Sequence, residues 1–417
     1  MPSFSIPLSG LAASSEALNI ISNNLANLNT VGFKDQSANF QDLFYQNIGS
    51  DGAGDPKQIG AGTSVGSIAT NYSDGSLQST GVSSNAAITG AGFFVTEQAN
   101  GTVQYTRAGD FTTNSAGLLV TSGGQMVMGY PAVNGVVNQG ATLSPLQVGQ
   151  GAVNPPSATT TMQQTTNLNA AATVGTTYST PQVVYDSLGE PHALTFNYTM
   201  SAPNTWTYQV TLPAADTGGT GNPTVLATGT LNFDSSGNLT SPTGTVPVAI
   251  TGLVDGAANM SPAWSLTDPS GTSLLTQIAS STSATTTSDQ NGYYGGTLST
   301  YSITQDGTIE GQFSNGQTQA IGQIALASFA NNQGLQLVGG NSYQSTLASG
   351  AAVVGSAGSG GRGTLTGGSV ELSNVDISTE FTNLIVVQRA FEADSRIVTT
   401  FDSVSSQTLN LQASPGN

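Results

Sequence analysis

Few residues in this chain could carry out chemistry. His192 is the single histidine and there is no cysteine, so disulfides, thiolate catalysis and metal sites rich in Cys or His are excluded. His192 follows Gly-Glu-Pro beside a turn, with no second histidine, thiol or nucleophilic serine motif nearby. This setting predicts an exposed loop residue rather than an acid–base catalyst.

The remaining motifs also predict structure rather than catalysis. The acidic turns at Asp234 and Asp306 lack the alternating carboxylates and the terminal Glu of a calcium loop, so we interpret both as hairpin turns. The glycine-rich run 355–363 lacks the Lys-Ser/Thr of a phosphate-binding loop and is interpreted as a linker. Two carboxylates could meet in a groove and hydrolyse a glycoside, but sequence does not give their separation. We expect no enzyme activity, no metal site and no cofactor.

The composition excludes further classes of function. The 417 residues include 6 Lys+Arg and 23 Asp+Glu, for a formal net charge of -17, and charged residues are only 7% of the chain. No Lys or Arg lies between Arg107 and Arg362, so the clustered cations that nucleic acids and anionic membranes require are missing there. No segment approaches the roughly 18–20 apolar residues of a membrane span. Met1–Gly10 has no basic region of a signal peptide.

Both ends of the chain have the periodicity of amphipathic helices. Near the N-terminus, a heptad row and its neighbouring rows comprise Phe4, Leu8, Leu11, Leu18, Ile21, Leu25 and Leu28. We predict a helix over residues 7–28, which the Asn-rich stretch 23–29 and Gly32 bring to an end. Near the C-terminus, steps of three and four join Ile377, Phe381, Leu384, Val387, Phe391, Val398, Phe401, Val404, Thr408 and Leu411. Asp376 or Ser378 is expected to cap this second helix.

Between the ends, the sequence predicts short antiparallel strands joined by tight turns. Asn-Gly and Asp-Gly pairs supply the positive φ angles of hairpin turns, and they begin at Asp74, Asn100, Asn134, Asp255, Asp306 and Asn315. Residues 93–95, 194–200 and 324–329 have the composition of strands. The predicted fold class is therefore mainly β with α-helical termini.

A change in composition divides the middle of the chain. Residues 154–287 are rich in Thr, Ala and Ser, and the sequence on either side has tighter turns. We predict a discontinuous multi-domain rod in which antiparallel β domains are nested and the terminal helices pair as a coiled-coil-like inner domain. The predicted parts are a helical assembly domain (1–30 with 370–417), a linker region (31–65 with 355–369), a β domain (66–153 with 288–354) and an inserted outer β domain (154–287).

Several motifs resemble those of the flagellar rod and hook proteins. At the two ends they are Leu8-Ser-Gly-Leu-Ala-Ala13, Ile21-Ser-Asn-Asn-Leu-Ala-Asn-Leu-Asn-Thr-Val-Gly-Phe-Lys34, Phe40-Gln-Asp-Leu-Phe44, Glu371-Leu-Ser-Asn-Val-Asp-Ile377 and Gln388-Arg-Ala-Phe-Glu392. Internal segments similar to the hook proteins in particular include Gly92-Phe-Phe-Val95, Val184-Tyr-Asp-Ser-Leu-Gly189 and Gly322-Gln-Ile-Ala-Leu-Ala327. The resemblance covers both ends and both flanks of the middle, and it is loose only over about 154–287.

This resemblance implies a structural subunit that self-assembles into the flagellar hook, the curved flexible tube that joins rod to filament. Such a tube transmits torque as a universal joint, and subunits are exported through its lumen. The resemblance implies a homo-oligomeric helical polymer with the inserted domain outermost, and with the distal rod protein, the hook cap protein and the hook–filament junction protein as neighbours. It also implies passage through the type III export apparatus to the extracellular hook without a cleaved signal peptide.

We expect subunit assembly to use the apolar stripes and motif residues of both ends. The candidates are Leu11, Leu18, Ile21, Asn23, Asn24, Leu25, Asn27, Leu28, Phe33, Ile377, Phe381, Leu384, Val387, Arg389, Phe391, Val398 and Phe401. The Asn residues either form a poor helix end or hydrogen-bond to backbone or to a neighbouring subunit, and we favour hydrogen bonding. Lys34 and Arg389 are scarce cations that are either solvated or at an interface, and the motif around Arg389 favours an interface.

Two other functions stay open at this point. A distal rod protein of the flagellar basal body would share the terminal motifs, but rod proteins are shorter and lack the inserted domain. A secreted β-rich adhesin or surface-layer protein, which belongs to a different class, would share the acidic, Ser/Thr-rich middle. It would give no reason for matched helical stripes at both ends of the chain.

Overall fold

The structure is a computed structural model that describes residues 5–50, 56–149 and 151–412. Contacts divide the chain into two units. The first comprises Met1–Ala152, Thr300–Gln312 and Thr318–Asn417, and the second comprises Val153–Ser299 and Phe313–Gln317. The second unit is thus inserted into the first, and it continues past residue 287, where the change in composition placed its end.

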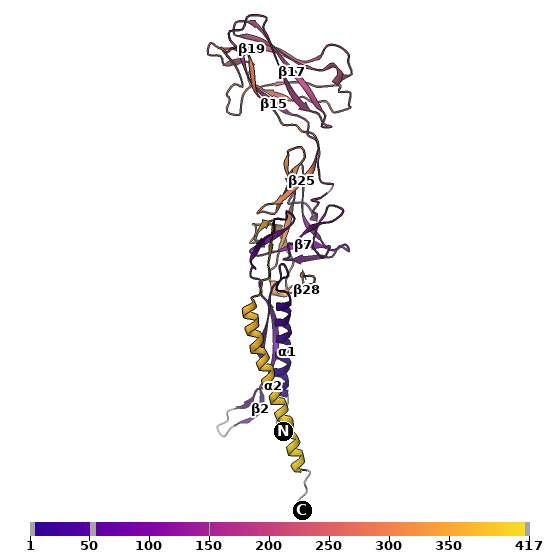
Figure 1. Cartoon of the computed structure of the whole chain (residues 1–417), viewed down its shortest axis with the longest axis vertical. Helices are drawn as coiled ribbons and strands as arrows, with labels where there is room; N and C mark the ends of the chain where they lie inside the picture. The colour runs from indigo at the N-terminus through magenta and orange to yellow at the C-terminus, as the bar shows by residue number, and fades with distance from the viewer. Residues whose placement is uncertain (1–4, 51–55, 150, 413–417) are drawn as a thin grey trace, which may run out of the picture. The chain divides into compact units, whose positions relative to one another are not determined.

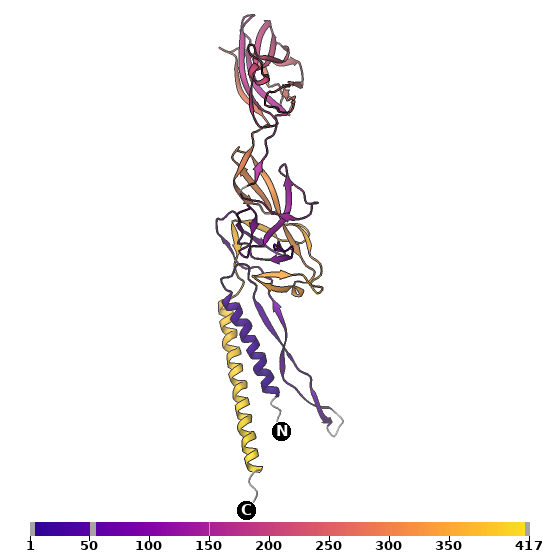
Figure 2. The same cartoon turned by 90° about the vertical axis from the view of Figure 1, so that its right-hand side faces the viewer.

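The fold class is mainly β with a helix near each end, as predicted. Helix α1 is Ser5–Ala26 and helix α2 is Ile377–Gln412. They lie side by side and antiparallel within the first unit (Figures 1 and 2). Asp376 caps α2, since its Oδ1 accepts the Thr379 N–H at 2.8 Å. Neither described helix has a stretch both long and apolar enough to cross a membrane.

The lengths of the two helices differ. Helix α1 has 22 residues and α2 has 36, which correspond to about 33 and 54 Å at 1.5 Å per residue. The start of α2 lies beside the end of α1, and Asp394 of α2 lies beside Gly10, where an added Cβ would be 2.7 Å from Asp394 Oδ2. The last turns of α2 therefore extend beyond the described start of α1.

A two-stranded antiparallel ribbon accompanies the helices. Strand β1 (Gln36–Asp42) pairs with β4 (Thr63–Thr70), and β2 (Gln46–Ser50) pairs with β3 (Pro56–Ile59). Ser9 of α1 accepts the Thr63 N–H through its Oγ at 3.1 Å. Residues 31–65, predicted as a linker, thus contain paired strands that are hydrogen-bonded to α1.

The rest of the first unit is a β domain with a buried core. Its main strand order is β26-β27-β11-β7-β8-β29-β28, and Phe94, Phe111 and Leu119 are buried in its core. The strands are β5 (Leu77–Ser79), β6 (Ala86–Thr89), β7 (Phe93–Glu97), β8 (Val103–Thr106), β9 (Thr112–Thr113), β10 (Leu119–Val120), β11 (Met126–Val133), β12 (Val136–Val137), β13 (Ser144–Pro145), β26 (Thr308–Phe313), β27 (Thr318–Ser328), β28 (Gln336–Gly339), β29 (Ser342–Gln344), β30 (Val353–Ser356), β31 (Thr364–Gly367) and β32 (Ser369–Glu371).

The prediction of a linker over 355–369 is wrong. Strands β30, β31 and β32 pair with β27, β6 and β5, and Leu365 is buried in the core. A Cβ added to Gly363 would lie 2.2 Å from the Thr89 carbonyl oxygen. The glycine therefore serves close backbone packing, and its presence does not indicate flexibility.

The inserted unit holds two five-stranded sheets and its own core. The sheets run β16-β17-β18-β19-β20 and β21-β22-β15-β23, with β24 paired to β15. Trp206, Trp264 and Phe196 are fully buried, and they alternate along their strands with residues that are more exposed. The strands are β14 (Val153–Asn154), β15 (Thr161–Asn169), β16 (Thr177–Tyr185), β17 (Pro191–Ala202), β18 (Thr205–Leu212), β19 (Thr224–Phe233), β20 (Leu239–Ser241), β21 (Thr245–Pro247), β22 (Ala263–Ser265), β23 (Leu275–Ile278), β24 (Ala284–Gln290) and β25 (Gly296–Ile303, which runs across the boundary between the units).

Five of the six predicted turns lie between paired neighbouring strands, and four of these are tight. The four tight turns begin at Asn100, Asn134, Asp306 and Asn315. The Asp255-Gly256 pair also lies in a turn between antiparallel partners, the longer connection from β21 to β22. The pair that begins at Asp74 lies between β4 and β5, which do not pair with each other, so the hairpin prediction is wrong there. The carboxylates of Asp74 and Asp255 both lie beside buried charged residues that come from distant parts of the chain.

Candidate functional site

The predicted residues of α2 form two groups. The face of α2 that lies along α1 is marked by Glu380, Val387 and Asp394, which are seven residues apart. Glu380 contacts Asn24, Val387 lines a small pocket beside α1, and Asp394 lies beside Gly10. Five predicted residues share this face and are half-buried: Leu384, Val387, Phe391, Val398 and Phe401. The others, Ile377, Phe381 and Arg389, are exposed, so the first group stabilises the helix pair and the second faces away from it.

Further apolar residues of α2 are exposed, and three of them, Ile385, Val386 and Ile397, are not in the predicted stripe. Val386, Ile397 and Val404 are 61, 45 and 49% exposed, and at 100° per residue they lie within about 20° of one another. Phe381 and Ile385 form a second row on the opposite flank, 52 and 51% exposed. We call these five residues the outer rows of α2. The continuous apolar run 384–387 was the signal for Ile385 and Val386, because four successive residues cannot share one face of a helix.

The predicted residues of α1 and the turn after it differ in exposure. Ile21 and Asn24 are buried, and Asn23 is exposed. Half-buried are Leu11, Leu18, Leu25, Asn27, Leu28 and Phe33. The heptad row of α1 is thus only partly covered within one chain.

Exposed apolar side chains also gather on the ribbon beside α1. Phe44 and Tyr45 are 94 and 60% exposed, and Phe40 and Ile59 are each about half exposed. The Phe40-Gln-Asp-Leu-Phe44 motif therefore presents aromatic rings to solvent in the single chain. Uncovered apolar side chains so close together are typical of an interaction surface.

Asn24 joins α1 to both of its neighbours. Its side chain is fully buried; Nδ2 donates to the Gln36 carbonyl at 2.7 Å, and Oδ1 accepts the Gln36 N–H at 3.0 Å. The same Nδ2 donates to Glu380 Oε1 at 3.3 Å. Asn27 Nδ2 donates to the Asn23 carbonyl at 2.9 Å, and Asn27 Oδ1 accepts from Thr30. The favoured prediction of hydrogen bonding to backbone is confirmed for Asn24 and Asn27.

Glu380 is a buried carboxylate with one satisfied oxygen. Its Oε1 accepts from Asn24, and its Oε2 has no hydrogen-bond partner among the residues that the structure describes. Burial raises the pKa of Glu380, and it also raises the pKa of Asp35, whose negative charge adds to the shift at Glu380.

Lys34 lies inside the protein, contrary to both of the roles considered for it. Its Nζ is 2.6 Å from Glu371 Oε1, with both side chains fully buried, and it donates to the Ser73 carbonyl at 2.6 Å. Burial lowers the pKa of Lys34, and the hydrogen bond and charge of Glu371 oppose this shift. The other oxygen of Glu371 lies 3.3 Å from Arg107 Nη1.

Further contacts stabilise the region around Lys34, Arg107 and Glu371, where the helices meet the β domain. We call this region the junction. Arg107 Nη2 donates to the Gly90 carbonyl at 2.7 Å, and Asp74 accepts the Gly90 N–H at 2.7 Å. Glu371 Oε1 accepts the Gly75 N–H at 2.8 Å. Two cations and two carboxylates are thus paired with one another, which makes the cluster a structural support rather than a source of catalytic groups.

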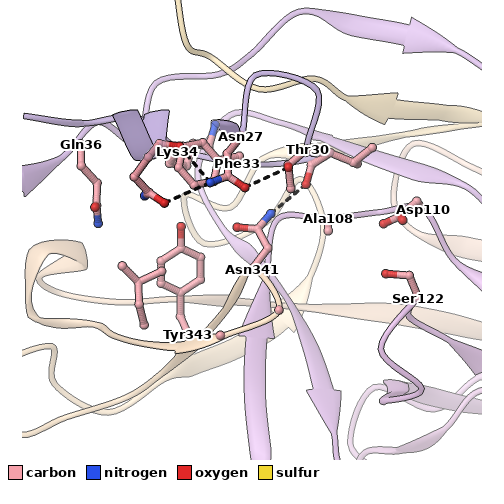
Figure 3. Close-up of a pocket in the computed structure, with 15 residues that line it drawn as sticks. Asn27, Thr30, Phe33, Lys34, Gln36, Ala108, Asp110, Ser122, Asn341 and Tyr343 are labelled. Atoms are coloured by element: carbon pink, nitrogen blue, oxygen red, sulfur yellow. Dashed lines mark hydrogen bonds between the residues drawn. The ribbon is translucent and has the colours of Figure 1, made fainter. Parts of the chain in front are cut away.

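A pocket of about 550 Å³ lies beside this junction (Figure 3). Asn341 Nδ2 donates to the Val31 carbonyl at 2.7 Å at its edge, and Lys34 and Tyr343 line it. Burial raises the pKa of Asp110, another lining residue. A Cβ added to Gly32 would be 2.6 Å from the Ala108 nitrogen, so this glycine permits the close contact between the turn and the β domain.

His192 is buried at the start of β17, and the prediction of an exposed loop residue is wrong. Its Nδ1 lies 2.8 Å from Asp216 Oδ2. Its Nε2 lies 3.4 Å from Asp186 Oδ2 and 3.7 Å from Asp255 Oδ2. Burial would lower the pKa of His192, but hydrogen bonds to Asp216 and Asp186 raise it above its ordinary value. Asp216 and Asp255 are 24 and 63 positions away in sequence, so no local motif could reveal the cluster.

The chain matches four family descriptions, which together cover most of its length. They are "Flagella basal body rod protein" over residues 6–34, "Flagellar hook protein FlgE/F/G D1 domain" over 87–167, "Flagellar basal body protein FlaE D2 domain" over 153–293 and "Flagellar basal body rod FlgEFG protein C-terminal" over 366–411. These matches include nearly all of both helices, Lys34, Arg107 and Glu371 of the junction, and most of the inserted unit.

Relatives match over nearly the whole chain. The flagellar hook protein FlgE of Salmonella typhimurium is 37% identical, covering 98% of this chain and 100% of the relative. The flagellar hook protein FlgE of Treponema pallidum is 33% identical, covering 97% of this chain and 98% of the relative. A crystal structure of the Helicobacter pylori flagellar hook protein FlgE2 aligns with a TM-score of 0.49 and 17% identity, over 69% of this chain and 98% of that one.

Proposed function

The chain belongs to the flagellar hook protein family, and we propose that it is the structural subunit that self-assembles into the flagellar hook. This is a family of structural proteins rather than enzymes. The adhesin and distal rod alternatives are not favoured, because hook proteins match this chain from end to end.

The observation that carries the proposal is the apolar surface left uncovered on the helices and ribbon. The outer rows of α2 and the ribbon residues Phe40, Phe44 and Tyr45 belong to the same unit, and solvent reaches all of them. Because α2 has apolar rows on two flanks, one helix can contact a neighbouring subunit on each side. Contacts of this heterologous kind do not close on themselves, and they build helical polymers.

The predicted assembly residues serve this function in two ways. Those that face α1, such as Leu384 and Phe391, fix the helix pair whose flanks are presented to neighbours. Those that face outward, such as Phe381 and Arg389, would contact neighbouring subunits directly. The junction around Glu371 holds the helix pair against the β domain, so that force on one part passes to the other, as torque transmission requires.

The finer expectations follow from the family. The neighbours of the polymer would be the distal rod protein, the hook cap protein and the hook–filament junction protein. The subunit would leave the cell through the flagellar type III export apparatus without a cleaved signal peptide and become part of the extracellular hook. We also propose that the helical part forms the inner layer, and that the inserted unit lies outermost.

Electron microscopy of the purified full-length chain tests the proposal. We expect curved tubes after the concentration is raised or a precipitating salt is added. Straight tubes would support a rod subunit instead, and monodisperse monomers under the same conditions would contradict a hook subunit.

A further inference from the structure

His192 and its acidic neighbours form a second cluster of functional groups, within the inserted unit. We propose that Asp186, His192 and Asp255 bind a divalent transition-metal ion, with Zn²⁺ the best match, and that Asp216 orients the imidazole. Among the described residues, this is the group of His and acidic side chains whose donor atoms converge closely enough to hold one ion, all within 4.8 Å of one another.

In each of the two carboxylate ligands, one oxygen accepts backbone hydrogen bonds and the other oxygen faces His192. Asp186 Oδ1 accepts the Leu188 and Glu190 N–H groups at 2.8 and 2.9 Å, which leaves Oδ2 beside His192. Asp255 Oδ1 accepts the Ala257 N–H at 2.9 Å, which leaves Oδ2 beside the same imidazole nitrogen. The arrangement is therefore formed in advance by the backbone of two turns.

Asp216 determines which imidazole nitrogen is available. With His192 Nδ1 protonated and donating to Asp216 Oδ2 at 2.8 Å, the Nε2 lone pair points toward the other two carboxylates. Metal-binding histidines are commonly oriented by a carboxylate on the second nitrogen. If the imidazole is neutral, its Nε2 lone pair faces negatively charged carboxylate oxygens and is repelled by them. A cation, either a metal ion or a proton, is therefore required between them.

The spacing of the donor atoms fits a small tetrahedral ion. Bonds of 2.0–2.1 Å at tetrahedral angles place ligand atoms about 3.3–3.4 Å apart. The Nε2 to Oδ2 separations of 3.4 and 3.7 Å are close to this value. One imidazole and two carboxylates are suitable ligands for Zn²⁺, and a water molecule would complete the set.

The charge of the unit favours a bound cation. No Lys or Arg lies between Arg107 and Arg362, so this unit has no basic side chain besides His192 to compensate its carboxylates. Asp186 is fully buried, where an uncompensated negative charge is costly. The Asp255 side chain is 25% exposed, which gives an ion a path from solvent. Bound metal would join the turn after β16, the start of β17 and the loop at Asp255.

The single histidine makes a direct test possible. Full-length protein labelled with ¹⁵N-histidine, freed of metal by a chelator, is titrated with Zn²⁺ at slightly alkaline pH while the two imidazole nitrogens are followed by NMR. We expect Nε2 to shift with a stoichiometry of one Zn²⁺ per chain, while Nδ1 keeps its proton. An Nε2 that stays protonated and does not respond to a tenfold excess of Zn²⁺ would overturn the proposal, and a proton would then be the positive species.

Two matched variants assign the ligands. Asp255→Asn keeps an oxygen for the Ala257 N–H but loses the charge, and Asp289→Asn removes an exposed carboxylate of the same unit. We expect Asp255→Asn to weaken Zn²⁺ binding at least tenfold and Asp289→Asn to leave it unchanged. Equal affinity of Asp255→Asn and the unaltered chain, or equal weakening by both substitutions, would overturn the site.

Discussion

Asn24 of α1 and Glu380 of α2 meet in the buried interior of the helix pair, where Asn24 Nδ2 donates to Glu380 Oε1 at 3.3 Å. They are 356 positions apart in sequence. Since Asn24 also binds both backbone groups of Gln36, one side chain joins the first helix, the ribbon and the last helix. The relative position of the three elements therefore depends on it.

Asn24→Ala removes these hydrogen bonds and leaves the polar groups of Gln36 and Glu380 buried without partners. We expect the free energy of unfolding of the monomer to fall by about 2–4 kcal/mol, at about 1–3 kcal/mol for each unsatisfied group. Urea denaturation followed by circular dichroism measures the loss. Asn19→Ala, at an exposed position of the same helix, is the control and should change the free energy by less than about 0.5 kcal/mol. Equal effects of both substitutions would contradict the role of Asn24.

Glu380→Gln should stabilise the protein at neutral pH. Burial raises the pKa of Glu380 in the folded chain, so the folded state binds more protons than the unfolded state between the ordinary pKa and the raised one. The free energy of unfolding due to this group therefore falls as the pH rises through that range. Urea denaturation across pH measures the free energy of unfolding of Glu380→Gln minus that of the unaltered protein. This difference should be positive near neutral pH and shrink at lower pH, where Glu380 is protonated. A difference that does not depend on pH would contradict this assignment.

Glu371→Gln should destabilise the first unit strongly. It leaves Lys34 and Arg107 buried without their shared carboxylate, and removing one partner of a buried ion pair costs about 3–5 kcal/mol. Thermal denaturation of the full chain should show an earlier transition for the first unit and an unchanged one for the inserted unit. Glu16→Gln, at an exposed position of α1, should have no such effect. A normal transition in Glu371→Gln would show that the cluster adds no stability.

Local sequence patterns predicted the helices, most of the turns and the fold class, because heptad spacing and Asn-Gly turns act over a few residues. The patterns failed where a side chain serves a distant partner. The Asp74-Gly75 pair is not a hairpin turn, and Asp74 instead binds the Gly90 N–H. The turn at Asp255 was predicted, but the contact of its carboxylate with His192 was not. Lys34 and Glu371 are 337 positions apart, and no composition or periodicity relates them. The predicted stripe of α2 included Phe381 and Val404 of the outer rows but not Ile385, Val386 and Ile397, because it mainly follows the face toward α1.

Removal of the inserted unit should leave a chain that still polymerises. Ser157 and Tyr293 exchange two backbone hydrogen bonds of 2.9 Å, so residues 158–292 can be replaced by Asn-Gly as a two-residue hairpin turn. Assembly through the helices and ribbon should persist, and the tubes should be straighter, because contacts between outermost units would bias the packing toward curvature. Curvature in electron micrographs is the measurement. Tubes as curved as those of the full chain would show that curvature comes from the inner layers.

The central claim is that the outer rows of α2 join one subunit to the next, and Ile397→Asp tests it most directly. Ile397 is 45% exposed in the single chain, so the monomer should unfold at its usual temperature. At a subunit interface the new carboxylate would be buried unpaired, at a cost of about 3 kcal/mol or more, which corresponds to a rise of about a hundredfold or more in the protein concentration needed for assembly. Thr400→Asp places the same charge at an exposed polar position one turn away, and it should assemble at nearly the usual concentration. Sedimentation of polymer against concentration is the measurement: a large rise for Ile397→Asp alone is predicted, and assembly of Ile397→Asp at the same concentration as Thr400→Asp would contradict the claim.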